Sequence, residues 1–478
     1  MTDLTALDIA STVRAVRARA LGPTELVRAF LARVESQDPG LGAFLRVDAE
    51  GALATARALE SRDDLDALPL AGVVLAVKDC LCTRGLRTTC GSRMLERWVP
   101  PYDAHVVARL RASGAIVLGK TNMDEFAMGS STENSAFFPT RNPRDPSRVP
   151  GGSSGGSAVA VAARMAQGAL GTDTGGSVRQ PAALTGVVGF KPTYGRVSRY
   201  GLVAFASSLD VVSPFGGSVG DVAAVYEAIA GHDPRDGTSA SLPVEPVLLP
   251  EGPEVLRGLR VGVPREYFSE GLDDVVRARV ESALDALQRA GAVLVPLSMP
   301  HTRYAVAAYY VLATAEASAN LARYDGVRYG LRVEGRHLKD LYGATRDRGF
   351  GPEVKRRILL GTFALSAGYQ QAFYGRAQRA RAHLREDFRQ TFAQVDVVAT
   401  PTSPTVAFPL GQRVDDPVAM YQADVCTLPA SLAGVPALSL PVGESPSGLP
   451  VGLQLLAPHF AEARLLRVAR GVEALGLR

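Results

Sequence analysis

Cysteine is scarce in this chain of 478 residues, with four in all, at positions 80, 82, 90 and 426. So few thiols cannot form a disulfide framework for a chain of this length, and no two of them stand in a CxxC pair. Proteins of the cytoplasm keep their thiols reduced. We therefore expect free cysteines and a cytoplasmic protein.

Long apolar runs and runs of like charge are also missing. The longest apolar stretches, residues 73–77 and 292–297, fall far short of the roughly 18 residues that a membrane span needs. The first residues are acidic and lack the basic and apolar regions of a signal peptide. The formal net charge is only +4, so we expect no membrane segment and no strong nucleic-acid binding by this chain alone.

Histidine and lysine are the rare titratable residues. None of the six histidines lies in an HExxH motif or has an evident catalytic partner, so the sequence does not support a zinc hydrolase. Arginine outnumbers lysine by 47 to 5. Codon bias is the simplest reason, but the imbalance makes each remaining lysine a candidate for a specific role: Lys78, Lys120, Lys191, Lys339 and Lys355.

The composition that remains is that of a globular protein, with 46% hydrophobic and 21% charged residues. Short apolar runs alternate with segments of helical periodicity, which indicates an α/β protein. We expect strands at 73–77, 115–118, 259–263, 292–297, 395–399, 437–441 and 451–456, and helices from 24 to a stop at 38–40, around 276–287 and from about 353 to 394. A loop at 240–253 with four prolines is either a domain boundary or a surface excursion.

Two short motifs match known sites but fit other structures better. Residues 114–121 match the GxxxxGK[ST] phosphate loop, yet the residues between its glycines, Ala-Ile-Val-Leu, are typical of a buried strand. Residues 151–155 match the GxSxG nucleophile elbow, yet three prolines in residues 141–150 exclude the strand that this elbow needs. We interpret the first motif as a strand with a turn and reject the second.

The most specific chemical signal is a pair of glycine- and serine-rich loops, residues 150–157 and 171–182, joined by a small-residue apolar helix. Glycines let a ligand approach the backbone, and successive N–H groups in such turns form a nest for an anion. Ser177 could attack a carbonyl while the preceding N–H groups hold the oxyanion. Lys78 is the candidate base because it ends an apolar strand, where burial favours the neutral amine. The alternative is a structural ion pair with Asp79.

These residues resemble the amidase-signature family, whose hallmark is this pair of loops with an upstream lysine. The signature covers about residues 151–182, and Ser177 follows Ser153 by 24 positions and Lys78 by 99, as in the family's triad. The resemblance implies that Ser177 is the nucleophile, that Ser153 follows a cis peptide bond and relays the proton, and that Lys78 is the base. It also implies an oxyanion hole formed by the backbone N–H groups of Thr174, Gly175, Gly176 and Ser177.

The resemblance implies a fold as well, a single large mixed β-sheet covered by helices on both faces. We expect one such domain over residues 1–478, with a helical segment at about 1–65, the signature core at about 66–235 and the proline-rich excursion at about 240–253. Within the loops, Ser154, Ser157 and Asp173 are expected to hydrogen-bond the turns, and Arg179 to brace the loop through a carboxylate.

Beyond the signature, residues of about 5–457 resemble the amidase subunits of tRNA-dependent amidotransferases, most clearly in segments 122–133, 191–210 and 317–326. In that branch a tyrosine, an arginine and an aspartate contact the substrate, and they match Tyr309, Arg357 and Asp424. From the residues alone, Arg357 and Asp424 would be ordinary charges on helix surfaces. Glutamine is a zwitterion, however, and would use an arginine for its carboxylate and a carboxylate for its ammonium.

The implied activity is a glutaminase whose Lys-Ser-Ser triad releases ammonia for the conversion of Glu-tRNA(Gln) to Gln-tRNA(Gln), or of Asp-tRNA(Asn) to Asn-tRNA(Asn). The implied assembly is a heterotrimer with subunits B and C. ATP, magnesium and most of the tRNA contacts are expected on the partner, and no cofactor or metal in this chain. Three alternatives stay open: a stand-alone amidase for another small amide, a phosphate-loop NTPase using Lys120, and a non-catalytic scaffold that keeps the loops for folding.

Overall fold

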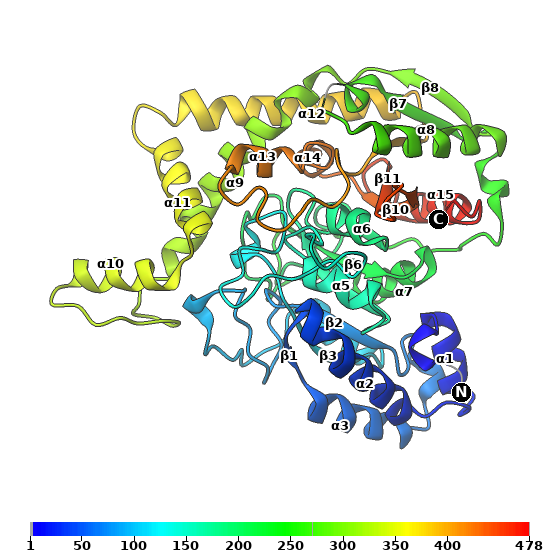
Figure 1. The fold of residues 1–478 in the computed structure, drawn as a ribbon, viewed down its shortest axis with the longest axis horizontal. Coiled ribbons are helices and arrows are strands. Elements are labelled where there is room, and N and C mark those ends of the chain that lie inside the picture. Colours follow the sequence, from blue (N-terminus) through cyan, green and yellow to red (C-terminus); the bar gives the residue numbers. More distant parts are fainter. Residues whose placement is uncertain (1–2, 270, 478) are drawn as a thin grey trace.

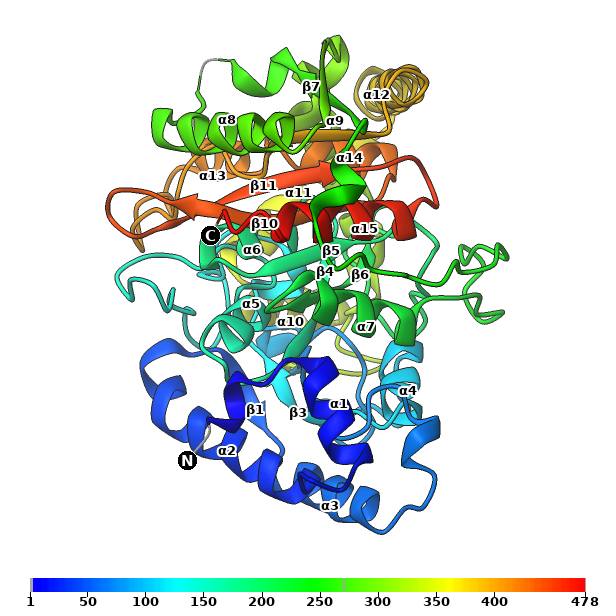
Figure 2. The same ribbon diagram turned by 90° about the vertical axis from the view of Figure 1, so that its right-hand side faces the viewer.

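The computed structural model describes residues 3–269 and 271–477. Within these residues one sheet of 11 strands runs from end to end of the molecule, in the order β1-β3-β2-β4-β6-β5-β10-β11-β9-β7-β8, with helices on either side (Figures 1 and 2). Helices α1, α7, α8 and α15 lie on one side of the sheet, and α9, α11, α13 and α14 on the other (Figure 1). The expected α/β fold with a large mixed sheet is confirmed.

Parallel and antiparallel pairs both occur in the sheet. Strand β2 is parallel to β3 and β4, and β7 is parallel to β8 and β9, whereas the remaining pairs are antiparallel. Every strand expected from the apolar runs is present. The bounds are β1 Phe44–Val47, β2 Val74–Lys78, β3 Ile116–Thr121, β4 Gly168–Asp173, β5 Val188–Lys191, β6 Val211–Gly216, β7 Arg260–Pro264, β8 Val293–Leu297, β9 Val397–Pro401, β10 Ala437–Glu444 and β11 Pro450–Leu456.

The α-helices of the described residues have the bounds α1 Ile9–Arg17, α2 Pro23–Leu41, α3 Ala49–Glu60, α4 His105–Ala112, α5 Gly155–Ala162, α6 Arg179–Thr185, α7 Val219–Ile229, α8 Asp274–Arg289, α9 Ala305–Asn320, α10 Leu338–Gly349, α11 Pro352–Leu365, α12 Arg376–Phe392, α13 Pro417–Gln422, α14 Leu428–Ala433 and α15 Glu462–Glu473. None of them is both long and apolar enough to cross a membrane.

Three element boundaries differ from those expected. Helix α2 continues through Pro39 and ends at Gly42, which takes a left-handed conformation with φ of 63°. The first 65 residues are not wholly helical, because β1 pairs with β3 there. The helix expected over 353–394 is two helices, α11 and α12, since Gly368 with φ of 86° lies in the turn between them. Each difference depends on a backbone turn or a tertiary pairing that periodicity does not report.

The sheet brings Lys78 and the second glycine-rich loop of the expected site together. Strands β2 and β4 are parallel neighbours, with Val77 opposite Leu170. Because neighbouring parallel strands have their carboxyl ends at the same edge, Lys78 at the end of β2 lies beside the loop that follows β4. Ligands of open α/β sheets bind at such edges.

Candidate active site

Lys78 is completely buried at the end of β2. Its Nζ lies 2.8 Å from Ser153 Oγ, 2.7 Å from Ser154 Oγ and 2.9 Å from Thr172 Oγ1. Among the described residues no carboxylate comes within ion-pair distance of it. Burial lowers the pKa of the Lys78 amine, because an ammonium there has lost its water and gained only neutral partners.

The neighbouring carboxylate is paired elsewhere. Asp79 lies 3.2 Å from the Nζ of Lys120, and both side chains are buried. Lys120 also donates to Leu81 O and Thr88 Oγ1, each at 2.8 Å. The interpretation of Lys78 as the partner of Asp79 is therefore wrong. The interpretation of residues 114–121 as strand and turn is confirmed, because Lys120 belongs to β3 and its amine faces the protein interior.

The first glycine-rich loop presents Ser153 after a cis peptide bond, Gly152–Ser153, as expected. The loop is held at both sides of that bond. Gly152 N donates to Gln180 Oε1 at 3.0 Å, and Asp124 N donates to Ser153 O at 3.2 Å. A Cβ at Gly152 would collide with the Asp124 carboxylate, so this position admits glycine alone.

The second loop carries Ser177 and is tied to the first by a hydrogen bond from Ser154 N to Ser177 O, of 3.2 Å. The backbone N–H groups of Gly175, Gly176 and Ser177 donate to no other group of the described chain. The Ser177 hydroxyl likewise has no hydrogen bond there, and the residue is buried, with 8% of its surface exposed. Gly176, with φ of 140°, packs against Thr427. The loop thus offers a hydroxyl beside unused backbone donors, and Lys78 contacts Ser153 directly but not Ser177.

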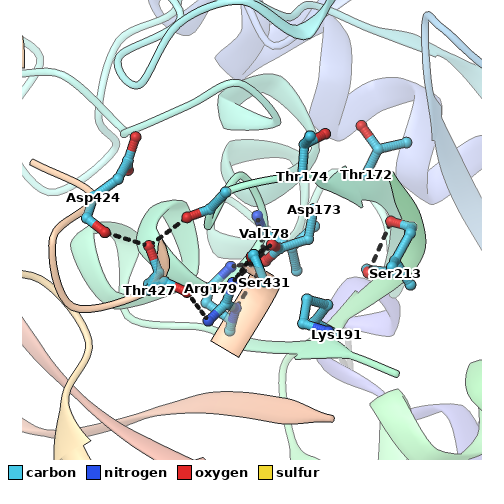
Figure 3. Close-up of polar contacts among 12 residues, drawn as sticks. Thr172, Asp173, Thr174, Val178, Arg179, Lys191, Ser213, Asp424, Thr427 and Ser431 are labelled. Carbon is cyan, nitrogen blue, oxygen red and sulfur yellow. Dashed lines mark hydrogen bonds and ion pairs between the residues drawn. The ribbon is translucent and has the colours of Figure 1, made fainter. Parts of the chain in front are cut away.

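A buried ion pair holds this loop in shape. The Arg179 Nε and a terminal nitrogen lie 2.9 and 2.8 Å from the two Asp173 oxygens, as Figure 3 shows. The rest of the guanidinium donates to Thr427 O, Gln454 Oε1 and Ser431 Oγ at 2.6–3.0 Å. The expected brace through a carboxylate is confirmed, and it also joins the loop to α14 and β11.

Two of the three expected substrate residues adjoin the loop of Ser177. Tyr309 on α9 is 4% exposed, and a Cβ on Gly175 would lie 2.7 Å from its ring. Asp424 follows α13, and its backbone oxygen accepts a 3.0 Å hydrogen bond from Thr427 Oγ1, which also donates to Gly175 O at 2.6 Å (Figure 3). Tyr309 and Asp424 therefore approach the same turn from different elements.

Arg357 and Asp424 are both buried, 2% and 7% exposed, so their interpretation as surface charges is wrong. The Arg357 Nε donates to Glu353 at 2.7 Å, and its terminal nitrogens donate to no group of the described residues. Ser130 Oγ donates to Asp424 Oδ2 at 2.5 Å, whereas the buried Oδ1 has no partner within the described ranges. Burial raises the pKa of Asp424 to about 7. The periodicity missed this burial because it is created by packing between distant elements.

Some functional contacts were not expected from the sequence. The Ser154 hydroxyl hydrogen-bonds the backbone of Thr172, as expected, but it also contacts Lys78, as does the hydroxyl of Thr172. Ser130, which contacts Asp424, was not singled out at all. The available signal was the density of hydroxyl residues in the segments 130–132 and 172–177. No group of three potential metal ligands occurs among the described residues.

Taken together, the site combines a buried amine among hydroxyls, a serine without a hydrogen bond beside free backbone donors, and a cation and an anion on the neighbouring elements that each keep unused hydrogen-bonding atoms. Comparison with known proteins agrees with this arrangement of groups. Residues 25–466 match the family described as Amidase. The A subunit of the glutamyl-tRNA(Gln) amidotransferase of Moorella thermoacetica is 60% identical over 451 positions, 94% of this chain and 92% of that protein.

The protein of the same name from Chloroflexus aurantiacus is 55% identical and covers 99% of this chain and 98% of its own length. Among solved structures, the A subunit of the glutamyl-tRNA(Gln) amidotransferase of Thermotoga maritima has a TM-score of 0.82 at 42% identity and covers 99% of this chain and 95% of its own. The chain therefore belongs to the amidase family.

Proposed function

We propose that this amidase is the glutamine amidohydrolase subunit of a tRNA-dependent amidotransferase. The observation that carries the proposal is a pair of opposite charges in one buried site whose hydrogen-bonding atoms are partly unused: the terminal nitrogens of Arg357 and the Oδ1 of Asp424. A free α-amino acid presents a carboxylate and an ammonium, and this pair complements both. A simple amide lacks one or both of these charges, and a peptide carries them on different residues rather than on one α-carbon.

In the proposed reaction, Lys78 is the base and Ser177 is the nucleophile. The neutral amine of Lys78 takes the proton of Ser153, which in turn takes that of Ser177 as the Ser177 oxygen attacks the side-chain amide carbon of glutamine. The N–H groups of residues 174–177 hold the oxyanion. The relayed proton returns to the leaving nitrogen, and ammonia departs. Water then attacks the acyl-enzyme, its proton passes through Ser153 to Lys78, and a proton returns to the Ser177 oxygen as glutamate is released.

Tyr309 closes the substrate site in this proposal. Its ring packs against Gly175, so it limits the space above the nest to a narrow side chain. Glutamine then enters with its amide towards Ser177 and its charged end between Arg357 and Asp424.

The relatives from Chloroflexus aurantiacus and Moorella thermoacetica are A subunits of glutamyl-tRNA(Gln) amidotransferases. We extend this to a cytoplasmic heterotrimer with subunits B and C, in which the first of these two partners holds tRNA, ATP and magnesium and receives the ammonia. The product is Gln-tRNA(Gln), or Asn-tRNA(Asn) where Asp-tRNA(Asn) is the substrate. The modest net charge of +4 fits a chain that leaves most tRNA contacts to a partner.

The test is co-expression with the two partner subunits. We expect a stable three-subunit assembly that forms Gln-tRNA(Gln) from misacylated Glu-tRNA(Gln) and ATP when either glutamine or free ammonia is supplied as the nitrogen donor. A Ser177→Ala assembly should lose the glutamine-dependent reaction but keep the one that uses free ammonia. A chain that hydrolyses unrelated amides alone and joins no partner would instead favour a stand-alone amidase.

A further inference from the structure

A patch of apolar side chains stands exposed on the outer face of α11 and the turn after it. Its members are Leu359, Leu360, Phe363, Tyr369 and Phe373, which are 71%, 45%, 50%, 47% and 40% exposed. Single exposed apolar residues are common on protein surfaces, but contiguous groups of them mark interaction sites. Figure 1 shows α11, with α10 beyond it, at the margin of the molecule. We call these five residues the α11 patch.

The aromatic members of the α11 patch contact one another. The Phe363 ring centroid lies 4.7 Å from that of Tyr369 and 5.6 Å from that of Phe373. Such ring pairs fix the side chains relative to each other without the help of the core. The patch is therefore ordered before anything binds, which lowers the entropy cost of binding.

The opposite face of α11 belongs to the candidate active site. Val354, Arg357 and Gly361 are buried on that face, and Gly361 lies so close to the Thr314 carbonyl of α9 that a Cβ would collide with it. The division between a packed face and an exposed apolar face is set by the sequence, since the two sets alternate at helical spacing. The exposed apolar face is therefore a feature of the sequence of α11 rather than a result of incomplete packing.

The segment that carries the α11 patch is basic, and the acidic residues at its two ends, Glu353 and Glu386, are both in ion pairs. Residues 354–385 contain seven basic residues and no Asp or Glu. Among them Arg376, Arg379 and Arg385 are exposed and form no ion pair with any carboxylate of the described chain. An apolar surface bordered by unpaired arginines complements a surface that is apolar at its centre and acidic at its border.

We propose that the α11 patch is the docking surface for a partner subunit of the assembly, through an apolar segment bordered by acidic residues. This inference rests on the proposed function, which makes the chain one subunit of several. The two leucines offer no stacking planes, and the three aromatic rings pack against one another at tilted angles of 32–54°, so the patch is not a flat stacking platform and a protein fits it better than an RNA. Because Arg357 lies on the same helix, the docked partner also steadies the cation expected to bind the glutamine carboxylate.

The test compares assemblies that contain Leu359→Asp with Phe363→Asp, or Arg376→Glu with Arg379→Glu, against the wild type. Leu248→Asp is the matched control, since Leu248 is 74% exposed in the loop 240–253. We expect each of the two double variants to raise the dissociation constant of the assembly by about 30-fold or more, as substitutions at interface hot spots do. The control should leave this dissociation constant unchanged. The melting temperature of each free chain should stay at the wild-type value, because all of these side chains are exposed.

The outcomes separate the two proposals. If the wild type assembles and the patch variants assemble equally well, the docking surface is wrong and the proposed function stands. If the variants assemble normally but their complex loses tRNA affinity, the patch is an RNA surface and the proposal is overturned. If the wild-type chain joins no partner at all, the proposed function fails and this inference fails with it.

Discussion

Replacement of Arg357 by alanine should abolish most glutamine hydrolysis while it spares the fold. The guanidinium has one internal ion pair, to Glu353, and two terminal nitrogens that are free to bind both oxygens of a carboxylate. Glu353 would keep Tyr421 as a hydrogen-bond donor at 2.9 Å and Arg356 as an ion-pair partner. The variant therefore leaves no isolated buried charge.

The size of the loss follows from the lost contacts. A hydrogen bond to a charged group contributes about 1.5–3 kcal/mol. The loss of two such bonds to the substrate carboxylate then costs roughly 3–6 kcal/mol, which corresponds to a fall in kcat/KM of about 10² to 10⁴. Arg356→Ala is the matched control, because Arg356 is the exposed neighbour on the same helix and also pairs with Glu353.

The assay measures glutamate release from glutamine and, in parallel, ammonia release from 4-aminobutanamide, which is glutamine without its carboxylate. We expect Arg357→Ala to lose activity on glutamine only, and Arg356→Ala to keep both activities. The reasoning is refuted if Arg357→Ala loses both substrates by the same factor with an unchanged melting temperature. It is refuted equally if the variant hydrolyses glutamine like the wild type, which is what a stand-alone amidase for another amide would do.

Three further changes test other parts of the site. Lys78→Met should lower kcat by about 10² to 10⁴, the usual contribution of a general base, and activity above a tenth of the wild type would argue against Lys78 in that role. In a Ser177→Ala background, the affinity for glutamine should fall as the pH drops below about 7, because the Asp424 carboxylate is then protonated and no longer attracts the ammonium. Calorimetry at several pH values measures this affinity. Asp424→Asn in the same background should bind glutamine weakly, with an affinity that does not change with pH. Lys120→Met should reduce the free energy of unfolding by about 3–5 kcal/mol, since it leaves Asp79 buried without its cation, and urea denaturation with no change would contradict the structural role.

The strands could be predicted from the sequence because each is a short apolar run buried on both faces, as in β2 and β3. The burial of Lys78 could be predicted because it ends an apolar strand, whereas its contact with Ser153 and the cis bond before Ser153 were indicated only by the family resemblance. The partner of Asp79 could not, because Lys120 is 41 residues away and reaches it only through the parallel pairing of β2 with β3. Lys78 is next to Asp79 in the sequence, but in the folded chain Asp79 pairs with Lys120.

The burial of the residues expected to bind the substrate could not be predicted from the sequence. Arg357 has the polar surroundings of a surface helix in the sequence, with Lys355 and Arg356 before it. Its burial depends on Tyr310 and Tyr421, whose rings lie 5.2 and 5.4 Å from the guanidinium and come from two other helices. Only the family resemblance indicated it.

The central claim is that Lys78 carries no charge in the resting site, and its own titration tests this most directly. With only five lysines in the chain, lysine side chains labelled with ¹³C at Cε should give a spectrum that can be assigned by single substitutions. We predict that the signal absent from the Lys78→Met spectrum titrates below the ordinary lysine pKa of about 10.4, because burial disfavours the ammonium. A Lys78 amine that stays protonated up to about pH 10 would contradict the account, since burial would then have failed to make it a base.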